Sequence, residues 1–427
     1  MRPRLPSSRP PLPCDHTVPA GRSSPSGPAA RALLRTAALI AALSGAMTSA
    51  AAPATRQIAP ALQAATVLAT GRMATGATPR AAVRDTAADR MNGPGGTTAL
   101  PPSSADPAVL TRTLAALRRA QAAVLGVQVL AVDDGRTLGQ LGQARSGSGI
   151  VIDDDGLVLT IGYLLIEAEQ VVLQPDDGRR VPARVLGWDA ATGLGLVQAL
   201  APLRIDPAPL ATATAPETGE PLMVVSGGED GMISLARLMA RRAYTGHWEY
   251  HLTEAYYTAP ARPDHSGAGL FNRDGELLGV GSLLLRDIDG GGSATALRVE
   301  ASSLPGNVFV PAALLPPILA ELRSRGTTRA SERAWLGLNC TAEDGRVRVL
   351  RVQDDSPADV AGLQAGDEIL RLDGQEIGSV EALWQTLWAP GESRREVRLD
   401  IRRDGQPLTL QAVSVDRRLA LKRPTGI

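Results

Sequence analysis

Aromatic residues are scarce in this chain of 427 residues: Phe, Tyr and Trp together make up 3% of it, against a hydrophobic content of 44%. Buried cores must therefore be built mainly from Val, Leu, Ile and Ala. Cysteine is almost absent as well. Because Cys14 lies in a predicted leader segment, Cys340 is left alone, and no intrachain disulfide is expected.

The four histidines show no spacing with Cys340 that is typical of a metal site, so neither a metal nor another cofactor is expected. His247 and His251 could share one face of a strand, but we interpret them as exposed or cross-strand-paired side chains rather than ligands. An excess of charge is also absent, because 44 basic residues balance 44 acidic ones. Composition therefore gives no electrostatic reason to expect binding to nucleic acid or to an anionic membrane.

A hydrophobic run long enough to span a bilayer is lacking too. The apolar segment 36–47 follows Arg31 and Arg35 and is too short for a stable membrane anchor. Small residues follow it, as a signal-peptidase site requires, and they favour a signal peptide over a buried helix. We interpret residues 1–52 as signal peptide and leader, which predicts an exported protein of the periplasm or cell envelope.

Low complexity follows the leader. Residues 53–106 are rich in Ala, Thr, Gly and Pro, and a segment of this composition buries too little apolar surface to offset its ordering entropy. A disordered linker is therefore predicted. Leu110, Leu114 and Leu117 then recur at helical spacing, which predicts a short amphipathic helix over 107–121.

Beyond this helix the pattern becomes mainly β. Short apolar runs alternate with turn signals such as Asp155-Gly156 and Asp177-Gly178, and the absence of strand–helix alternation excludes a parallel α/β sheet. Regular short strands of this kind predict a barrel or a sandwich. The predicted strands are 124–132, two runs within 148–160, 170–174, 180–186, 194–200, 221–226, 231–239, 249–257, 269–272 and 276–284.

Several segments, in this order, resemble those of the HtrA/Deg protease family. They are the opening hairpin 147–160 (GSGIVIDDDGLVLT), a second hairpin 176–189 (DDGRRVPARVLGWD), a nucleophile loop with its next strand 264–279 (DHSGAGLFNRDGELLG), a linker helix 309–322, and the bacterial PDZ segments 335–338 (WLGL) and 356–369 (SPADVAGLQAGDEI).

This resemblance implies a mainly β protein in which a trypsin-like double β-barrel is followed by a PDZ domain. The two six-stranded barrels would be perpendicular, with the site between them. Residues 107–325 would form the barrel domain with its linker helix, and residues 331–419 the PDZ domain. A homo-oligomer stays open, since family members often trimerise, although the Ala-rich N-terminal segment has no matching aromatic anchors.

A trypsin-like protease needs a Ser nucleophile, a His base and an Asp that orients the His. The resemblance places Tyr163 at the His position and Gly193 at the Asp position, while the nucleophile is kept as Ser266. A phenol, whose pKa is ordinarily about 10, is a poor general base at neutral pH. The sequence therefore predicts a protease triad that lacks two of its three members.

The surroundings of Ser266 also depart from the family. Where the family has Gly at the start of Gly-Asn-Ser-Gly-Gly, this chain has Asp264. Glycine there lets the backbone form the oxyanion hole, whereas Asp264 adds a Cβ and a carboxylate near the point where negative charge would develop. We interpret Ser266 as vestigial, since nothing in the sequence places His265 or another histidine within its reach.

PDZ domains bind an extended peptide by strand addition, and the backbone N–H groups of one loop capture its terminal carboxylate. The resemblance places the loop at 335–338 and the pairing strand at 338–341. A helix over 379–387 would form the other wall, unless its apolar side chains merely fill the core. The candidate peptide-binding residues are Trp335, Leu336, Gly337, Leu338, Asn339, Val380, Leu383 and Trp384.

Two function hypotheses follow. The first is an exported pseudoprotease that binds peptides or unfolded envelope proteins, with C-terminal carboxylates held at the PDZ domain. The second is an active serine-type endopeptidase that uses an unrecognised base. The absence of His at position 163 favours the first, and an imidazole within hydrogen-bond reach of Ser266 would favour the second.

Overall fold

The computed structural model describes residues 107–211, 215–289 and 303–424, all of which belong to one compact unit of the chain. The predicted signal peptide and linker, with Cys14, lie outside the described residues. Within the described ranges, no helix is both long enough and apolar enough to cross a membrane.

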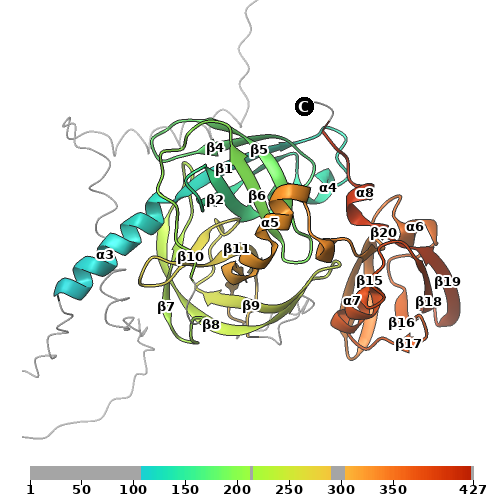
Figure 1. Cartoon of the computed structure of the whole chain (residues 1–427). Helices are drawn as coiled ribbons and strands as arrows, with labels where there is room; N and C mark the ends of the chain where they lie inside the picture. The colour runs from blue at the N-terminus through green and yellow to red at the C-terminus, as the bar shows by residue number, and fades with distance from the viewer. Residues whose placement is uncertain (1–106, 212–214, 290–302, 425–427) are drawn as a thin grey trace, which may run out of the picture. The chain divides into compact units, whose positions relative to one another are not determined.

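A first barrel closes from six antiparallel strands in the order β1-β2-β3-β6-β5-β4 (Figure 1). The Asp155-Gly156 turn joins β2 to β3 as predicted, and Gly156 has a φ of 81°, which glycine adopts without strain. The strands are β1 (Val124–Ala131), β2 (Ala144–Val151), β3 (Leu157–Ile161), β4 (Ala168–Gln174), β5 (Val181–Trp188) and β6 (Leu194–Ala199).

A second barrel closes in the order β10-β11-β12-β9-β8-β7. The mainly β class and the pair of six-stranded barrels are thereby confirmed. The strands are β7 (Pro221–Val225), β8 (Ile233–Thr245), β9 (His251–Ala259), β10 (Gly269–Phe271), β11 (Leu277–Leu285) and β12 (Gly306–Pro311).

Two local predictions in the second barrel were wrong. Residues 309–311, assigned to the linker helix, belong to β12, because their apolar side chains are buried in the barrel instead of lining one helical face. The helix α5 (Pro316–Arg325) begins only after a short 3-10 turn. His247 and His251 do not share a strand, since β8 ends at Thr245 and His247 lies in the connection to β9.

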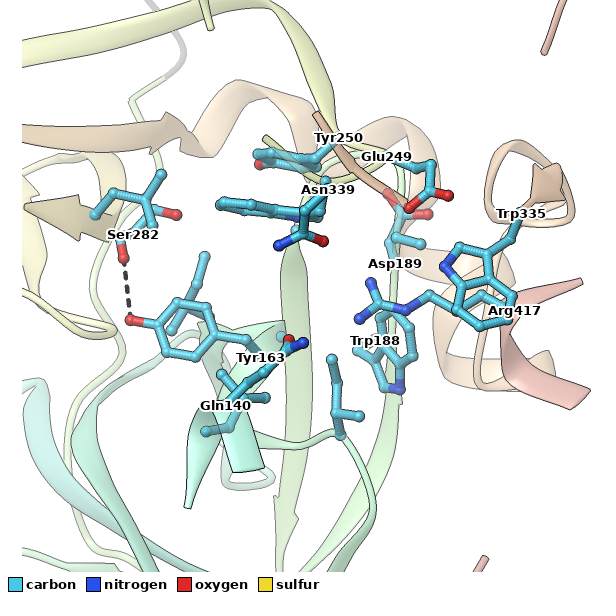
Figure 2. A pocket seen from close by; sticks show the side chains of 18 of the residues that line it. Gln140, Tyr163, Trp188, Asp189, Glu249, Tyr250, Ser282, Trp335, Asn339 and Arg417 are labelled. Atoms are coloured by element: carbon cyan, nitrogen blue, oxygen red, sulfur yellow. Dashed lines mark hydrogen bonds between the residues drawn. The ribbon is translucent and has the colours of Figure 1, made fainter. Parts of the chain in front are cut away.

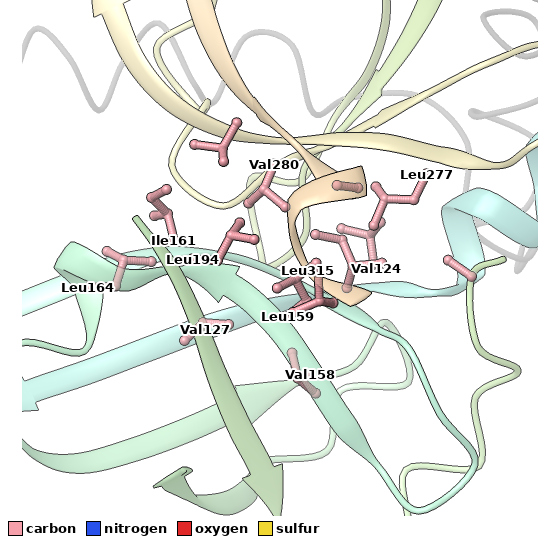
Figure 3. Close-up of a cluster of buried hydrophobic side chains, with 14 of the residues drawn as sticks. Val124, Val127, Val158, Leu159, Ile161, Leu164, Leu194, Leu277, Val280 and Leu315 are labelled. Carbon is pink, nitrogen blue, oxygen red and sulfur yellow. The ribbon is translucent and has the colours of Figure 1, made fainter. Parts of the chain in front are cut away.

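The barrel core is built mainly from aliphatic side chains, as the low aromatic content predicts. Figure 3 shows Val, Leu and Ile residues of both barrels packed together, among them Leu159 of β3 and Val280 of β11, both fully buried. The helix α3 (Pro107–Ala122), predicted over 107–121, adds Leu117 and Ala120 to this cluster. One continuous core therefore holds the two barrels together.

The C-terminal part has its own core around one sheet, ordered β14-β15-β16-β18-β19 with β17 beside β16. Strand β14 stands at the edge of this sheet, so one row of its backbone groups has no partner strand within the sheet. The strands are β14 (Leu338–Glu343), β15 (Arg346–Val352), β16 (Glu368–Leu372), β17 (Gln375–Glu376), β18 (Glu396–Arg403) and β19 (Gln406–Val413), and β13 (Ala334–Trp335) pairs with β20 (Val415–Asp416).

The helix α7 (Val380–Trp388) covers this sheet. Ser379 caps it by accepting a hydrogen bond from the Ala382 N–H at 3.0 Å, and its buried apolar residues recur at helical spacing. The remaining short helices are α4 (Leu138–Leu141), α6 (Pro357–Val360) and α8 (Arg417–Ala420), with 3-10 turns η2 (Gly162–Leu164), η3 (Ala312–Leu314) and η4 (Arg329–Ser331).

A close backbone approach fastens α5 to the first barrel. Gly326, the residue after the helix, lies so near Gly187 of β5 that a Cβ on Gly187 would stand 2.2 Å from the Gly326 carbonyl oxygen. Gly187→Ala should therefore lower the free energy of unfolding by about 1–3 kcal/mol, because backbone must move. Gly139→Ala, where nothing lies within 4 Å, is the control. Equal denaturation midpoints for the two variants would contradict this packing.

Candidate functional site

Tyr163 and Ser266 meet where the two barrels face each other. Tyr163 lies in η2, directly after β3, and Ser266 lies between β9 and β10. The Tyr163 hydroxyl is 2.7 Å from Ser266 Oγ and 3.0 Å from the Ser282 carbonyl oxygen; Figure 2 marks the latter bond. The structure thus places the side chain at the predicted His position against the predicted nucleophile.

The hydrogen positions follow from the partners. A carbonyl oxygen can only accept, so Tyr163 donates to Ser282 and the Ser266 hydroxyl donates to Tyr163 when both bonds form. Burial raises the pKa of Tyr163 to about 12, although the hydrogen bond with Ser266 acts in the opposite direction. The phenol is therefore neutral at physiological pH and is too weakly basic to take a proton from Ser266.

Gly193, at the predicted Asp position, has no room for a side chain. Its φ is 81°, and a Cβ there would stand 2.7 Å from the hydroxyl oxygen of Tyr250. That hydroxyl donates to the Thr192 carbonyl oxygen at 2.7 Å. Tyr250, which sequence reasoning missed, therefore fills the space beside Gly193.

Asp264 is paired. Arg262, whose side chain is almost buried, donates to Asp264 Oδ1 from Nε at 3.0 Å and to Oδ2 from Nη2, and the Ser226 hydroxyl donates to Oδ2. Burial raises the pKa of Asp264, but these bonds and the Arg262 charge outweigh it and hold the pKa below its usual 3.8. The negative charge is thus compensated, which weakens the repulsion expected from sequence.

The described histidines have other partners. His265 Nδ1 bonds to the Arg262 carbonyl oxygen at 3.1 Å, His251 Nδ1 to the Thr245 hydroxyl at 2.9 Å, and His247 Nδ1 to the Cys340 carbonyl oxygen at 3.2 Å. Burial lowers the pKa of His265 and of His251. Within the described part of the chain, the hydrogen bond of Ser266 Oγ is made with Tyr163 and not with an imidazole.

A cavity of about 300 Å³ opens beside Tyr163 (Figure 2). Aromatic rings form much of its wall, and the rings of Trp248 and Tyr250 are stacked with their centroids 5.9 Å apart. Asn339 and the guanidinium of Arg417 add polar groups to the lining. No cluster of three or more His, Cys, Asp or Glu side chains that could hold a metal ion occurs among the described residues.

The predicted carboxylate-binding loop is bonded to a glutamate side chain of the same protein chain. The backbone N–H groups of Leu336, Gly337 and Leu338 donate to Oε1 of Glu249 at 3.1, 2.8 and 3.1 Å. Gly337 has a φ of 84°, and a Cβ there would stand 2.3 Å from Cβ of Ser356, so the loop requires glycine. Sequence reasoning missed Glu249, which lies 87 residues before Leu336.

The other predicted peptide-binding residues divide into two groups. Trp335 lies in β13, and half-buried Asn339 lies on β14 and lines the cavity. Val380, Leu383 and Trp384 of α7 are buried in the C-terminal core, as the alternative interpretation has it, yet the Trp384 indole N–H also reaches the Gly246 carbonyl oxygen at 3.2 Å.

Two family models match the chain: a trypsin-like peptidase domain over residues 147–280 and a PDZ domain over residues 334–413. The putative serine protease HhoA of Synechocystis is 26% identical over 298 residues, which cover 66% of this chain and 73% of HhoA. Both matched domains, in this order, make the chain similar to serine proteases of the HtrA/DegP type. The periplasmic serine endoprotease DegP of Escherichia coli K12 is 27% identical over 242 residues, which cover 56% of this chain and 50% of DegP.

Solved structures of this type are similar as well. A serine endoprotease from Yersinia pestis aligns with a TM-score of 0.43 and 22% identity, covering 71% of this chain and 97% of that one. The HtrA-type protease AlgW, solved with a tripeptide, aligns with a TM-score of 0.43 and 20% identity, covering 73% of this chain and 98% of that one.

The Asp264 pair predicts a pH-dependent stability. A carboxyl whose pKa is lowered by folding contributes stability above its unfolded pKa, and that stability is lost as the pH falls through the folded pKa. Asp264→Asn should therefore cost about 1–3 kcal/mol at pH 7, and its difference from the wild type should shrink below the usual pKa of 3.8. Asp274→Asn, at an exposed turn, is the control in urea titrations. A pH-independent difference would contradict the charged pair.

Proposed function

We propose that this chain is an exported pseudoprotease of the HtrA/DegP type, which holds peptides or unfolded envelope proteins through its PDZ domain without cleaving them. The observation that carries the proposal is the hydroxyl pair of Tyr163 and Ser266. A serine nucleophile of this type needs a base that removes its proton, and the group bonded to Ser266 Oγ is a buried, neutral phenol.

The surroundings of the pair support the same conclusion. Gly193 provides no carboxylate to orient a base, and Tyr250 occupies the adjoining space. In another serine protease, loss of the nucleophile or of the base alone costs about a million-fold in turnover. Replacement of both the base and its orienting group therefore leaves Ser266 without activation.

Peptide holding is the function that the rest of the chain supports. The C-terminal domain keeps an edge strand, β14, beside a loop whose three N–H groups converge on a single carboxylate oxygen. Export is supported by the signal-peptide pattern of residues 31–52 and by relatives whose names describe them as periplasmic.

Absence of cleavage is the first expected outcome. The purified chain should leave unfolded casein intact between pH 6 and pH 9, the range about neutrality in which the phenol stays protonated. A fluorophosphonate probe should not label Ser266, so the wild type and Ser266→Ala should give the same background. Cleavage or labelling that disappears in Ser266→Ala would overturn the proposal.

Peptide binding is the second expected outcome. A peptide with an apolar last residue and a free carboxylate should bind with a dissociation constant in the micromolar range typical of small transient interfaces, and the amidated peptide should not bind. Gly337→Glu should abolish binding, whereas Gly345→Glu, with a similar φ but open space around it, should not. Calorimetry that finds equal affinity for free and amidated peptides would contradict carboxylate capture.

A further inference from the structure

The connection between β8 and β9 lies along the edge of β14 that has no partner strand in the sheet. The Cys340 N–H donates to the His247 carbonyl oxygen at 2.7 Å, and Nδ1 of the His247 ring bonds to the Cys340 carbonyl oxygen at 3.2 Å. From α7, the Trp384 indole N–H donates to the Gly246 carbonyl oxygen of the same connection. A peptide that adds a strand to β14 would form main-chain bonds of the same kind.

The Glu249 carboxylate completes the likeness to a bound peptide. Its Oε1 accepts from all three N–H groups of the Leu336–Leu338 loop, which is the role of a terminal carboxylate in this kind of domain. The loop itself is fixed by its own carbonyl groups, since Gly337 accepts from the Gln353 N–H at 2.9 Å and Leu336 from the Ala358 N–H at 2.9 Å. The N–H groups are therefore held in place to receive a carboxylate.

Burying the Glu249 carboxylate in this contact costs free energy, and this cost favours its displacement by an incoming ligand. Burial raises the pKa of Glu249, because a charge inside protein loses its hydration, while the N–H bonds and the nearby Arg417 act in the opposite direction. A terminal carboxylate would make the same three bonds. Exchange of one carboxylate for the other therefore leaves no N–H group of the loop unsatisfied.

We propose that residues 246–249 are a built-in ligand of the PDZ groove, and that a peptide with a free terminal carboxylate binds by displacing Glu249 from the Leu336–Leu338 loop. This inference rests on the proposed peptide-holding function and extends it, because the groove is closed until a ligand competes. The partner that fits is an extended peptide whose main chain replaces His247 along β14.

The need to displace Glu249 weakens the affinity of the groove for a peptide. Binding to a groove that is open for only a fraction of the time is weakened by that fraction. A ligand on a short tether also competes at a high effective concentration, in the millimolar range for flexible linkers. Removing the Glu249 carboxylate should therefore strengthen peptide binding instead of weakening it.

The first arm of the test measures binding to the full chain by calorimetry, with an apolar-ended heptapeptide that has a free carboxylate. Glu249→Ala should bind at least about tenfold more tightly than the wild type, and Glu249→Gln, whose amide oxygen can still accept the N–H bonds, should bind less tightly than Glu249→Ala. Glu254→Gln, which removes a half-exposed carboxylate of β9 paired with Arg241, is the matched control and should bind like the wild type. Equal affinity of the Glu249 variants and the wild type would overturn the inference.

The second arm measures amide hydrogen exchange of the full chain without peptide. The N–H groups of Gly337, Leu338 and Cys340 should be protected in the wild type and should exchange at least about tenfold faster in Glu249→Ala. Val397 and Leu399, buried in β18, report on folding and should stay unchanged. Unprotected loop amides in the wild type would overturn the inference.

The two arms separate this inference from the function on which it rests. If no variant binds the free peptide but the loop amides open in Glu249→Ala, the built-in ligand stands and terminal-carboxylate capture fails. If the wild type and the Glu249 variants bind the peptide equally, capture stands and the built-in ligand fails.

Discussion

A single carboxylate oxygen, Oε1 of Glu249, accepts three main-chain N–H bonds from the Leu336–Leu338 loop and so joins the second barrel to the PDZ domain. Charge-assisted bonds of this kind are the strong ones, and three on one oxygen fix the position of the chain that carries it. The pairing of His247 with Cys340 follows from that position, because both contacts come from one short connection between β8 and β9. The second barrel and the edge of the PDZ sheet are thus joined along this connection.

The same connection reaches Gly193, the residue at the predicted Asp position. Tyr250, which follows Glu249, stacks on Trp248. Its hydroxyl donates to the Thr192 carbonyl oxygen and lies in the space beside Gly193. An aspartate at position 193 and the present course of Tyr250 are sterically incompatible. Gly193 and the Leu336–Leu338 loop are therefore in contact with neighbouring residues of one strand connection, Tyr250 and Glu249.

Local sequence patterns were sufficient where local chemistry decides the structure. The Asp155-Gly156 turn, the capped helix after Ser379 and the placement of Tyr163 and Gly193 all follow from short motifs. Glu249 could not be found in this way, because its partners lie almost ninety residues along the chain and depend on how two domains meet. The Arg262 partner of Asp264 stands only two residues before it, so a local ion pair could have been predicted from the sequence.

The most direct test is a crystal structure of the chain grown with an apolar-ended peptide that has a free carboxylate. The peptide carboxylate should bond to the N–H groups of Leu336, Gly337 and Leu338, its main chain should pair with β14, and Glu249 should be displaced from the loop. A structure in which the peptide is bound elsewhere while Glu249 keeps its three N–H bonds would contradict this displacement.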